Sequence, residues 1–186
     1  MLKRLLFTLV ALSFTTSPLW AETTQSGNVI LPVTDSSYKG HPVLSLVGGT
    51  LSPSAAGSES GSLVGVELSL DCPLFQASAG NVRQQISYTT YSKSNLSVSL
   101  IEINPHWMTE LSPGFTAGFG PGLGLAQTSV TGGSSASYFE YGLGASASYK
   151  TGALVFGFEL RNMTTGKKNN ADMSNSRTLL KAGYAF

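Results

Sequence analysis

Two histidines and one cysteine are the side chains of this 186-residue chain with the clearest capacity for chemistry. A hydrolytic site needs a histidine beside a serine or cysteine nucleophile, with an acidic group behind it. Met108 stands two residues after His106, and His41 has no nucleophile next to it. His106 and Cys72 together offer two ligands, whereas a structural zinc site takes four. The sequence therefore predicts no catalytic residue and no metal site, and it places His106 in a polar position near a strand end.

Alternate glycines between Gly118 and Gly124 invite comparison with a phosphate-binding loop. The glycines of such a loop lie in a turn that opens a helix, and a Lys-Ser or Lys-Thr pair follows them. Here the glycines occupy every second position, which places them on one face of a strand, and no such pair follows. We expect them to leave room for long side chains inside the fold, and we predict no cofactor.

The composition excludes several classes of protein. Eleven Lys and Arg residues against ten Asp and Glu residues give a net charge of +1, which provides no basic face for nucleic acid. Charged residues make up 11% of the chain and hydrophobic residues 41%, whereas a disordered chain combines few apolar residues with a high net charge. The single cysteine rules out a disulfide framework. At this length, one folded domain is expected.

The first 21 residues have the order of a secretory signal peptide. Lys3 and Arg4 precede an apolar run over residues 5–14, and we expect cleavage after Ala21, although Leu19 stands where a small residue is preferred. The alternative, a membrane anchor, would need about 20 apolar residues, and this run is too short. We therefore divide the chain into a signal peptide (1–21), a polar N-terminal segment (22–41) and a folded domain (42–186).

Apolar and polar residues alternate through most of the folded domain, which is the pattern of strands with two unlike faces. The pattern indicates eight strands of about 9–13 residues each, where roughly 9–11 tilted residues cross a bilayer. They fall at about residues 43–51, 64–71, 82–91, 95–107, 115–126, 139–150, 154–161 and 178–186. The phase of the first strand is not determined. A one-residue slip in the fourth strand predicts a β-bulge near Leu100.

The connections between these strands differ in length. Long polar or small-residue segments join strands at 52–62, 128–138 and 164–176, whereas only Thr151 and Gly152 join the sixth and seventh strands. Outer-membrane barrels have long external loops and short periplasmic turns, so this pattern favours that architecture. Two connections are exceptions: a short external loop at 92–94 and a longer periplasmic one at 72–81.

The charged residues of the strands share the face that carries the small residues. Four are acidic and four are basic: Glu67, Asp71, Arg83, Glu140, Lys150, Glu159, Arg161 and Lys181. Balanced charges suit a closed interior in which they pair, and a face of Gly, Ser and Ala is a poor coat for a soluble protein. Aromatic residues near the strand ends match the interfacial girdles of membrane barrels. These features predict an all-β fold, a closed, antiparallel, eight-stranded transmembrane up-and-down β-barrel.

The ending Leu180–Phe186 alternates and finishes on phenylalanine, which resembles the terminal strand of Gram-negative outer-membrane proteins. With Ser112-Pro113-Gly114 and the glycine-rich stretch 118–124, it makes residues 42–186 similar to the small outer-membrane β-barrel family that includes opacity proteins and other porin-family members. The resemblance implies a location in the bacterial outer membrane, in contact with its lipid and lipopolysaccharide. It also implies that Tyr184 and Phe186 form an insertion signal read by the barrel-assembly machinery, with periplasmic chaperones as further transient partners.

Three functions remain open. The first is a non-enzymatic barrel, structural or surface-interacting, whose extracellular loops meet a host or surface ligand. The second is a narrow porin-like channel for small solutes, and the third is a lipid-modifying enzyme. Eight strands close to a diameter that side chains can fill, so we expect the inward charges to prevent conduction. Lys167 and Lys168 lie in the longest loop, where contact with lipopolysaccharide phosphates and ordinary solvation are the two interpretations.

Overall fold

The computed structural model describes residues 29–54, 59–133, 135–166 and 172–186. The expected signal peptide (1–21) lies outside these ranges, as do residues 22–28 of the polar segment and Lys167 and Lys168 of the longest loop. Within the described ranges, no helix is both long and apolar enough to cross a membrane.

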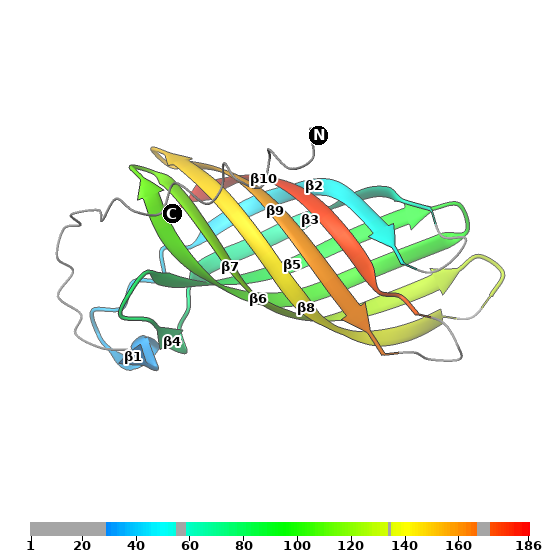
Figure 1. The fold of residues 1–186 in the computed structure, drawn as a ribbon, viewed down its shortest axis with the longest axis horizontal. Coiled ribbons are helices and arrows are strands. Elements are labelled where there is room, and N and C mark those ends of the chain that lie inside the picture. The colour runs from blue at the N-terminus through cyan, green and yellow to red at the C-terminus, as the bar shows by residue number, and fades with distance from the viewer. Residues whose placement is uncertain (1–28, 55–58, 134, 167–171) are drawn as a thin grey trace, which may run out of the picture.

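Eight strands form one closed barrel (Figure 1). They are β2 (Val43–Pro53), β3 (Gly61–Asp71), β5 (Asn81–Lys93), β6 (Leu96–Ser112), β7 (Phe115–Val130), β8 (Ser135–Thr151), β9 (Leu154–Thr165) and β10 (Asn175–Ala185). Each strand pairs antiparallel with the next barrel strand of the sequence, and β10 pairs with β2 to close the circle. The predicted closed, antiparallel, up-and-down topology is therefore confirmed.

A second, two-stranded sheet lies beside one end of the barrel (Figure 1). It pairs β1 (Val29–Ile30) with β4 (Phe75–Gln76), and the short 3-10 helix η2 (Pro32–Thr34) follows β1. The strand β4 lies within the long connection expected at 72–81. The N-terminal segment therefore packs along this connection before it enters the barrel at β2.

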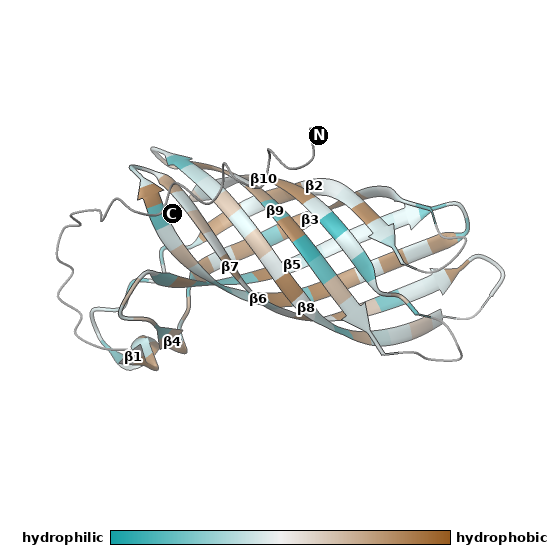
Figure 2. Cartoon of the chain, in the orientation of Figure 1, coloured by the Kyte–Doolittle hydropathy of each residue, from teal (hydrophilic) through white to brown (hydrophobic). Residues whose placement is uncertain are grey.

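Hydrophobic and hydrophilic residues alternate along the barrel strands (Figure 2). Large apolar side chains point outward and are exposed, as in Leu46 (71%), Leu143 (68%) and Leu180 (64%). Glu67 and Glu159, from the alternate positions, are buried inside. A soluble barrel has the opposite arrangement, so the exterior of this barrel matches hydrocarbon rather than water.

The bulge predicted near Leu100 is wrong. Strand β6 pairs with β5 in one continuous register, and the shift in its register with β7 lies between Glu110 and Ser112. Leu100 points into the barrel and is fully buried, whereas Ile101 points outward and is half exposed. Both faces of β6 are apolar at this level, and that change of face, rather than an inserted residue, produces the apparent slip.

Several strands are longer than the alternation indicated. β6 and β8 have 17 residues and β7 has 16, so the connection expected at 128–138 shrinks to residues 131–134. Polar residues at the strand ends still join the ladder, as in Thr128 opposite Ala136, because backbone pairing does not depend on side-chain polarity. The other connections at this end span residues 54–60, 94–95 and 166–174.

The opposite end of the barrel carries two turns of two residues each. Residues 113–114 join β6 to β7, and residues 152–153 join β8 to β9. Gly114 (φ 77°) and Gly152 (φ 60°) supply the left-handed conformations that these turns require. The chain enters β2 and leaves β10 at this same end, which we call the periplasmic end because short turns face the periplasm in outer-membrane barrels (Figure 1).

Candidate functional site in the barrel interior

Arg161 lies at the centre of a buried cluster of charged side chains. Its Nη1 lies 2.9 Å from Glu102 Oε2, its Nη2 lies 3.1 Å from Glu67 Oε2, and its Nε donates to Glu159. These partners come from β6, β3 and β9, so one guanidinium reaches across the lumen to opposite walls. Buried charges are tolerated only when they are paired and hydrogen-bonded, and Arg161 meets this condition.

Two further cations extend this cluster along the barrel. Lys181 Nζ lies 2.6 Å from Glu67 Oε2 and also contacts Glu159, and Arg177 lies 2.6 Å from Glu102 Oε2 and 2.7 Å from Glu140 Oε2. Three cations therefore hold four carboxylates. We call this set the lumen network: Glu67, Glu102, Glu140, Glu159, Arg161, Arg177 and Lys181.

The structure divides the eight charged residues singled out in the sequence into three groups. Five lie in the lumen network: Glu67, Glu140, Glu159, Arg161 and Lys181. Asp71 and Arg83 form a separate pair near the periplasmic end, with 3.0 Å between Oδ1 and Nη1. Lys150 lines the cavity at that end, is exposed, and has no ion pair with a described residue.

The sequence reasoning missed two members of the network, Glu102 and Arg177. Strand alternation predicts both, because every second residue points to the same face. In β6, alternation from Leu100 places Glu102 inside, and in β10 Arg177 lies on the same inward face as Lys181. The supposed slip near Leu100 hid the first. The second lay one residue before the expected start of the last strand.

The inward glycines of β7 and β8 leave room for these long side chains, as expected. A Cβ atom on Gly124 would lie 2.9 Å from Glu140 Oε1 and 2.9 Å from Glu102 Cγ. A Cβ atom on Gly144 would lie 2.9 Å from His106 Nε2. Side chains at these positions would therefore displace the residues that fill the lumen.

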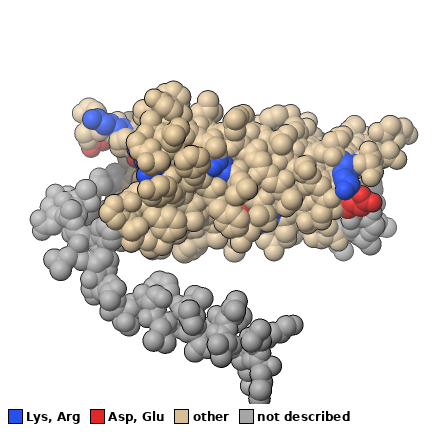
Figure 3. All heavy atoms as spheres, turned by 90° about the horizontal axis from the view of Figure 1, so that it is seen from above, with Lys and Arg blue, Asp and Glu red and all other residues tan. Residues whose placement is uncertain are grey.

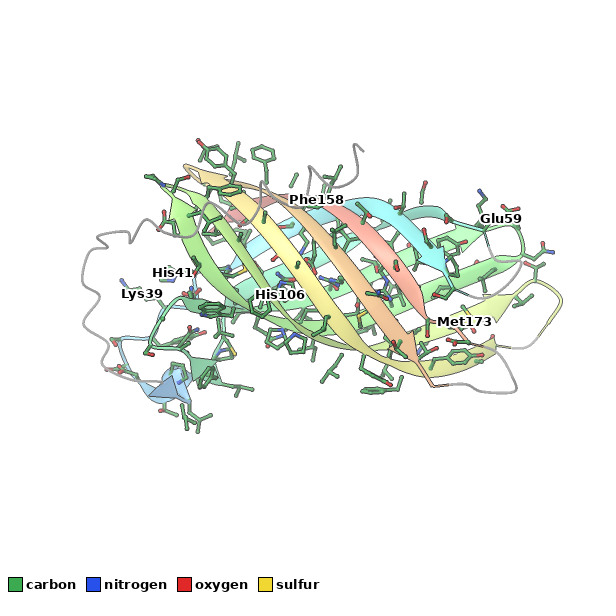
Figure 4. The ribbon with its side chains drawn as sticks, viewed as in Figure 1. Lys39, His41, Glu59, His106, Phe158 and Met173 are labelled. Atoms are coloured by element: carbon green, nitrogen blue, oxygen red, sulfur yellow. The ribbon has the colours of Figure 1, made fainter. Side chains whose placement is uncertain are left out.

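A layer of apolar side chains closes the lumen on the extracellular side of the network. Leu63, Leu100 and Leu179 are at most 1% exposed, and Tyr91 is 2% exposed. The layer contains Val47, Leu51, Leu63, Tyr91, Val98, Leu100, Ala126, Tyr138 and Leu179, with Met173 packed against it (Figure 4). The interior therefore has an apolar layer and a charged layer in series, of which the sequence reasoning anticipated only the charged one.

The periplasmic side of the network opens into a cavity of about 570 Å³, lined by Arg83, Lys150 and Ser146 among others. Asp71 lies at the edge of this cavity. The Asp71 carboxylate pairs with Arg83 and lies 2.7 Å from His41 Nδ1. The Tyr38 hydroxyl donates to the backbone oxygen of Asp71. Burial, with a further contribution from the Asp71 carboxylate, raises the pKa of Tyr38.

His106 lies inside the barrel rather than near a strand end (Figure 4). Its Nδ1 lies 2.9 Å from Ser146 Oγ, while its Nε2 is 3.8 Å from Glu159 Oε1, beyond hydrogen-bonding distance. Arg161 and Lys181 contact the Glu159 carboxylate instead. The arrangement lacks the acid–histidine hydrogen bond that orients a catalytic imidazole, so His106 and Ser146 fill the lumen as a polar pair.

No group of three His, Cys, Asp or Glu side chains that could hold a metal ion occurs among the described residues. Cys72 is a buried free cysteine.

The outer surface of the barrel is uncharged over most of its length. In Figure 3 the viewed face is tan, with the most prominent charged atoms near its two ends. Outward aromatic side chains are exposed near both ends of the strands, among them Trp107 and Tyr184 on one side and Tyr88 and Phe139 on the other. Aromatic side chains in such positions form the interfacial girdles of membrane barrels.

No protein-family model matches the chain, and no curated protein matches it. Solved structures do match. Neisserial surface protein A (NspA) is 18% identical with a TM-score of 0.58, covering 79% of this chain and 97% of its own. Ail, the attachment invasion locus protein of Yersinia pestis, is 16% identical with a TM-score of 0.55, covering 80% and 100%. The N-terminal β-barrel domain of Pseudomonas aeruginosa OprF is 16% identical with a TM-score of 0.52, covering 80% and 100%.

The chain has the fold of a small outer-membrane β-barrel. The match covers the closed barrel of these proteins almost completely, and the apolar exterior independently requires a membrane around it. Ail has also been solved in complex with the heparin analogue sucrose octasulfate.

Proposed function

We propose that this protein is a non-enzymatic outer-membrane barrel, structural or surface-interacting, that acts through its extracellular loops. The observation that carries the proposal is the filled lumen, in which the apolar layer and the lumen network lie in series. A barrel closed in this way has no route for solutes, so its loops and outer surface are what meet the environment. Ail, with the same fold, binds a heparin analogue, which supports a host or surface ligand as the partner.

The described parts of the loops are braced against the barrel. Tyr91 Oη donates to the backbone oxygen of Glu59 (2.6 Å), and Lys93 Nζ lies 3.4 Å from Glu59 Oε2. The β2–β3 connection is thereby tied to the β5–β6 hairpin. A loop held by the rigid barrel presents a defined surface to a ligand, since less ordering is required on binding.

The geometry of the histidines argues against a lipid-modifying enzyme. Such an enzyme would place its catalytic groups where the acyl chains and headgroups are, on the outer face of the barrel. His106 lies in the lumen and is 1% exposed, and His41 lies at the periplasmic end beside Asp71. Neither imidazole faces the hydrocarbon region.

Shortening the loops tests the main proposal. We expect cells whose barrel has residues 54–60 and 166–174 each replaced by Asn-Gly to lose at least tenfold in binding to immobilised heparin or to host cells. Because Leu51 pairs with Gly61 and Met163 pairs with Asn175, each replacement leaves a four-residue connection, a common hairpin length. The barrel itself should therefore survive, as judged by the different gel mobility of unboiled and boiled protein. The matched control lengthens the β8–β9 turn at the opposite end by two residues. Equal binding by the loop-shortened and unmodified proteins would refute the proposal.

The last residue provides a test of biogenesis. Phe186 is 74% exposed, and its ring lies edge-on to Tyr184 at 5.3 Å. We propose that this pair is the signal read by the barrel-assembly machinery, so Phe186→Ser should lower the amount in the outer membrane several-fold and increase periplasmic degradation. Phe186→Tyr keeps an interfacial aromatic side chain and should assemble normally. Unchanged assembly of the serine variant at ordinary expression would show that the ending is not a signal.

A further inference from the structure

The sheet of β1 and β4 is the core of a flap, residues 29–34 and 73–76, at the periplasmic end. Beyond the β1–β4 pairing, the Leu31 amide donates to Leu74 O (2.9 Å) and the Val33 amide donates to Pro73 O (3.2 Å). Along the long axis of the barrel the flap lies at the level of the β6–β7 and β8–β9 turns, displaced sideways from the wall (Figure 1). It therefore lies beside the end of the barrel, where the surrounding bilayer would meet the periplasm.

The flap is partly buried against its connection to the barrel, and its other large side chains are apolar and exposed. Pro32 and the neighbouring side chains of Cys72 and Val82 are buried. The large apolar side chains that the flap exposes are Ile30 (76% exposed), Leu31 (47%), Val33 (52%), Leu74 (61%) and Phe75 (39%). Five large apolar side chains exposed together on so small a structure indicate a surface that contacts something other than water.

The covered side of the flap and its connection adjoin the lipid-facing wall. Val82 points outward from β5 opposite Trp107 of β6, and the Trp107 indole donates to the backbone oxygen of Ala79 in the β4–β5 connection. The Trp107 ring meets Phe119 edge-on at 5.8 Å, and both rings are exposed on the outer face of the barrel. Tryptophan in this position marks the boundary between headgroups and acyl chains. The flap thus adjoins the apolar wall that the bilayer covers, at the level of this tryptophan.

The polar residues of the N-terminal segment mark the other boundary of this surface. The Asp35 carboxylate accepts hydrogen bonds from the amide (2.8 Å) and the hydroxyl (2.7 Å) of Ser37, and these bonds lower the pKa of Asp35. Asp35 therefore stays ionised and remains in water. Lys39, nearer the barrel, is also exposed (Figure 4).

We propose that the flap is a lipid-binding element, whose exposed apolar side chains insert at the headgroup–acyl boundary of the inner leaflet of the outer membrane. The partner is a phospholipid surface, held by Ile30, Leu31, Val33, Leu74 and Phe75. Side chains of this kind bind an interface by burying apolar area while adjoining polar groups stay hydrated. The flap would fix the depth and rotation of the periplasmic end in the bilayer.

Spin labels on single cysteines test this placement. The chain with Cys72→Ala is reconstituted into vesicles of phosphatidylethanolamine and phosphatidylglycerol, with a label at Val33→Cys or Leu74→Cys. Matched controls carry the label at Ser36→Cys or Lys39→Cys, also exposed positions of the same segment. Collision with oxygen, which concentrates in the bilayer, is compared with collision with a water-soluble nickel chelate. Each variant is first shown to be folded by its gel mobility before boiling.

We expect oxygen accessibility to exceed nickel accessibility several-fold at positions 33 and 74, and the reverse at positions 36 and 39. Higher nickel than oxygen accessibility at positions 33 and 74 would place the flap in water and overturn the proposal. Spectral broadening that disappears on dilution with unlabelled protein would show that a second copy covers the flap. Shielding from both reagents without broadening would show that protein covers it. Either of these two results would also overturn the proposal.

Discussion

Arg161→Met is expected to destabilise the folded barrel by about 3–5 kcal/mol, because removing one partner of a buried ion pair leaves the other charge uncompensated. Arg161 is 3% exposed and contacts three carboxylates, those of Glu67, Glu102 and Glu159. Methionine retains much of the length of arginine, so the loss would come from charge more than from a cavity. Urea unfolding of the protein refolded into lipid vesicles, followed by gel mobility, measures the change.

Lys150→Met is the matched control for this experiment. Lys150 also points into the lumen from its strand, but it is exposed at the periplasmic end and has no ion pair with a described residue. Its replacement should change stability by no more than about 0.5 kcal/mol, as is usual for surface positions. If Arg161→Met lowers the free energy of unfolding by no more than Lys150→Met does, the ion pairs of the lumen network do not stabilise the barrel.

The purified protein is expected to show no steady conductance in a planar lipid bilayer. Two layers block the lumen in series, the apolar layer around Leu63, Leu100 and Leu179 and the lumen network around Arg161 and Arg177. Eight-stranded barrels are just wide enough for side chains to fill them, whereas water-filled porins use 16–18 strands. Opening one layer should therefore leave the other closed.

This series arrangement defines the variants. The triple variant Leu63→Ala/Leu100→Ala/Leu179→Ala and the double variant Arg161→Ala/Arg177→Ala should each remain closed, or show only brief openings. Their combination should conduct in reproducible steps, provided that its gel mobility shows a folded barrel. Stable conductance of the unmodified protein that changes on Glu159→Ala or Arg161→Ala would refute the closed lumen and favour the channel function.

The alternation of residue types was sufficient to predict the barrel and which face of most strands is polar. A strand has a period of two, so parity along β3, β7 or β9 assigns every side chain to one face without reference to other strands. Glu67, Glu159 and Arg161 were placed inside on this basis, and the structure has them there. The same reasoning failed in β6, because Leu100 and Ile101 are both apolar on opposite faces. Where both faces are apolar, polarity carries no information about phase.

The partners of the inward charges were not available from the sequence. Parity shows that Arg161 and Glu102 both face the lumen, but they lie 59 positions apart on β9 and β6, and only the closure of the sheet brings them to 2.9 Å. The apolar layer was hidden for a related reason. Leu63, Tyr91 and Leu179 come from β3, β5 and β10, and nothing local distinguishes an inward leucine at the extracellular end from an outward one elsewhere.

The flap shows the same division between local and tertiary information. Composition marked residues 22–41 as a polar segment and 72–81 as a long connection, and neither has an alternation that indicates pairing. Their pairing as β1 and β4 joins residues 45 and 47 positions apart through backbone hydrogen bonds, which any sequence can form. By itself, the sequence determined eight alternating strands and an interior that carries charge, because these depend on local order and period. The tertiary structure alone decided which charges meet, where the lumen closes and what the flap exposes, because these depend on contacts between residues distant in the chain.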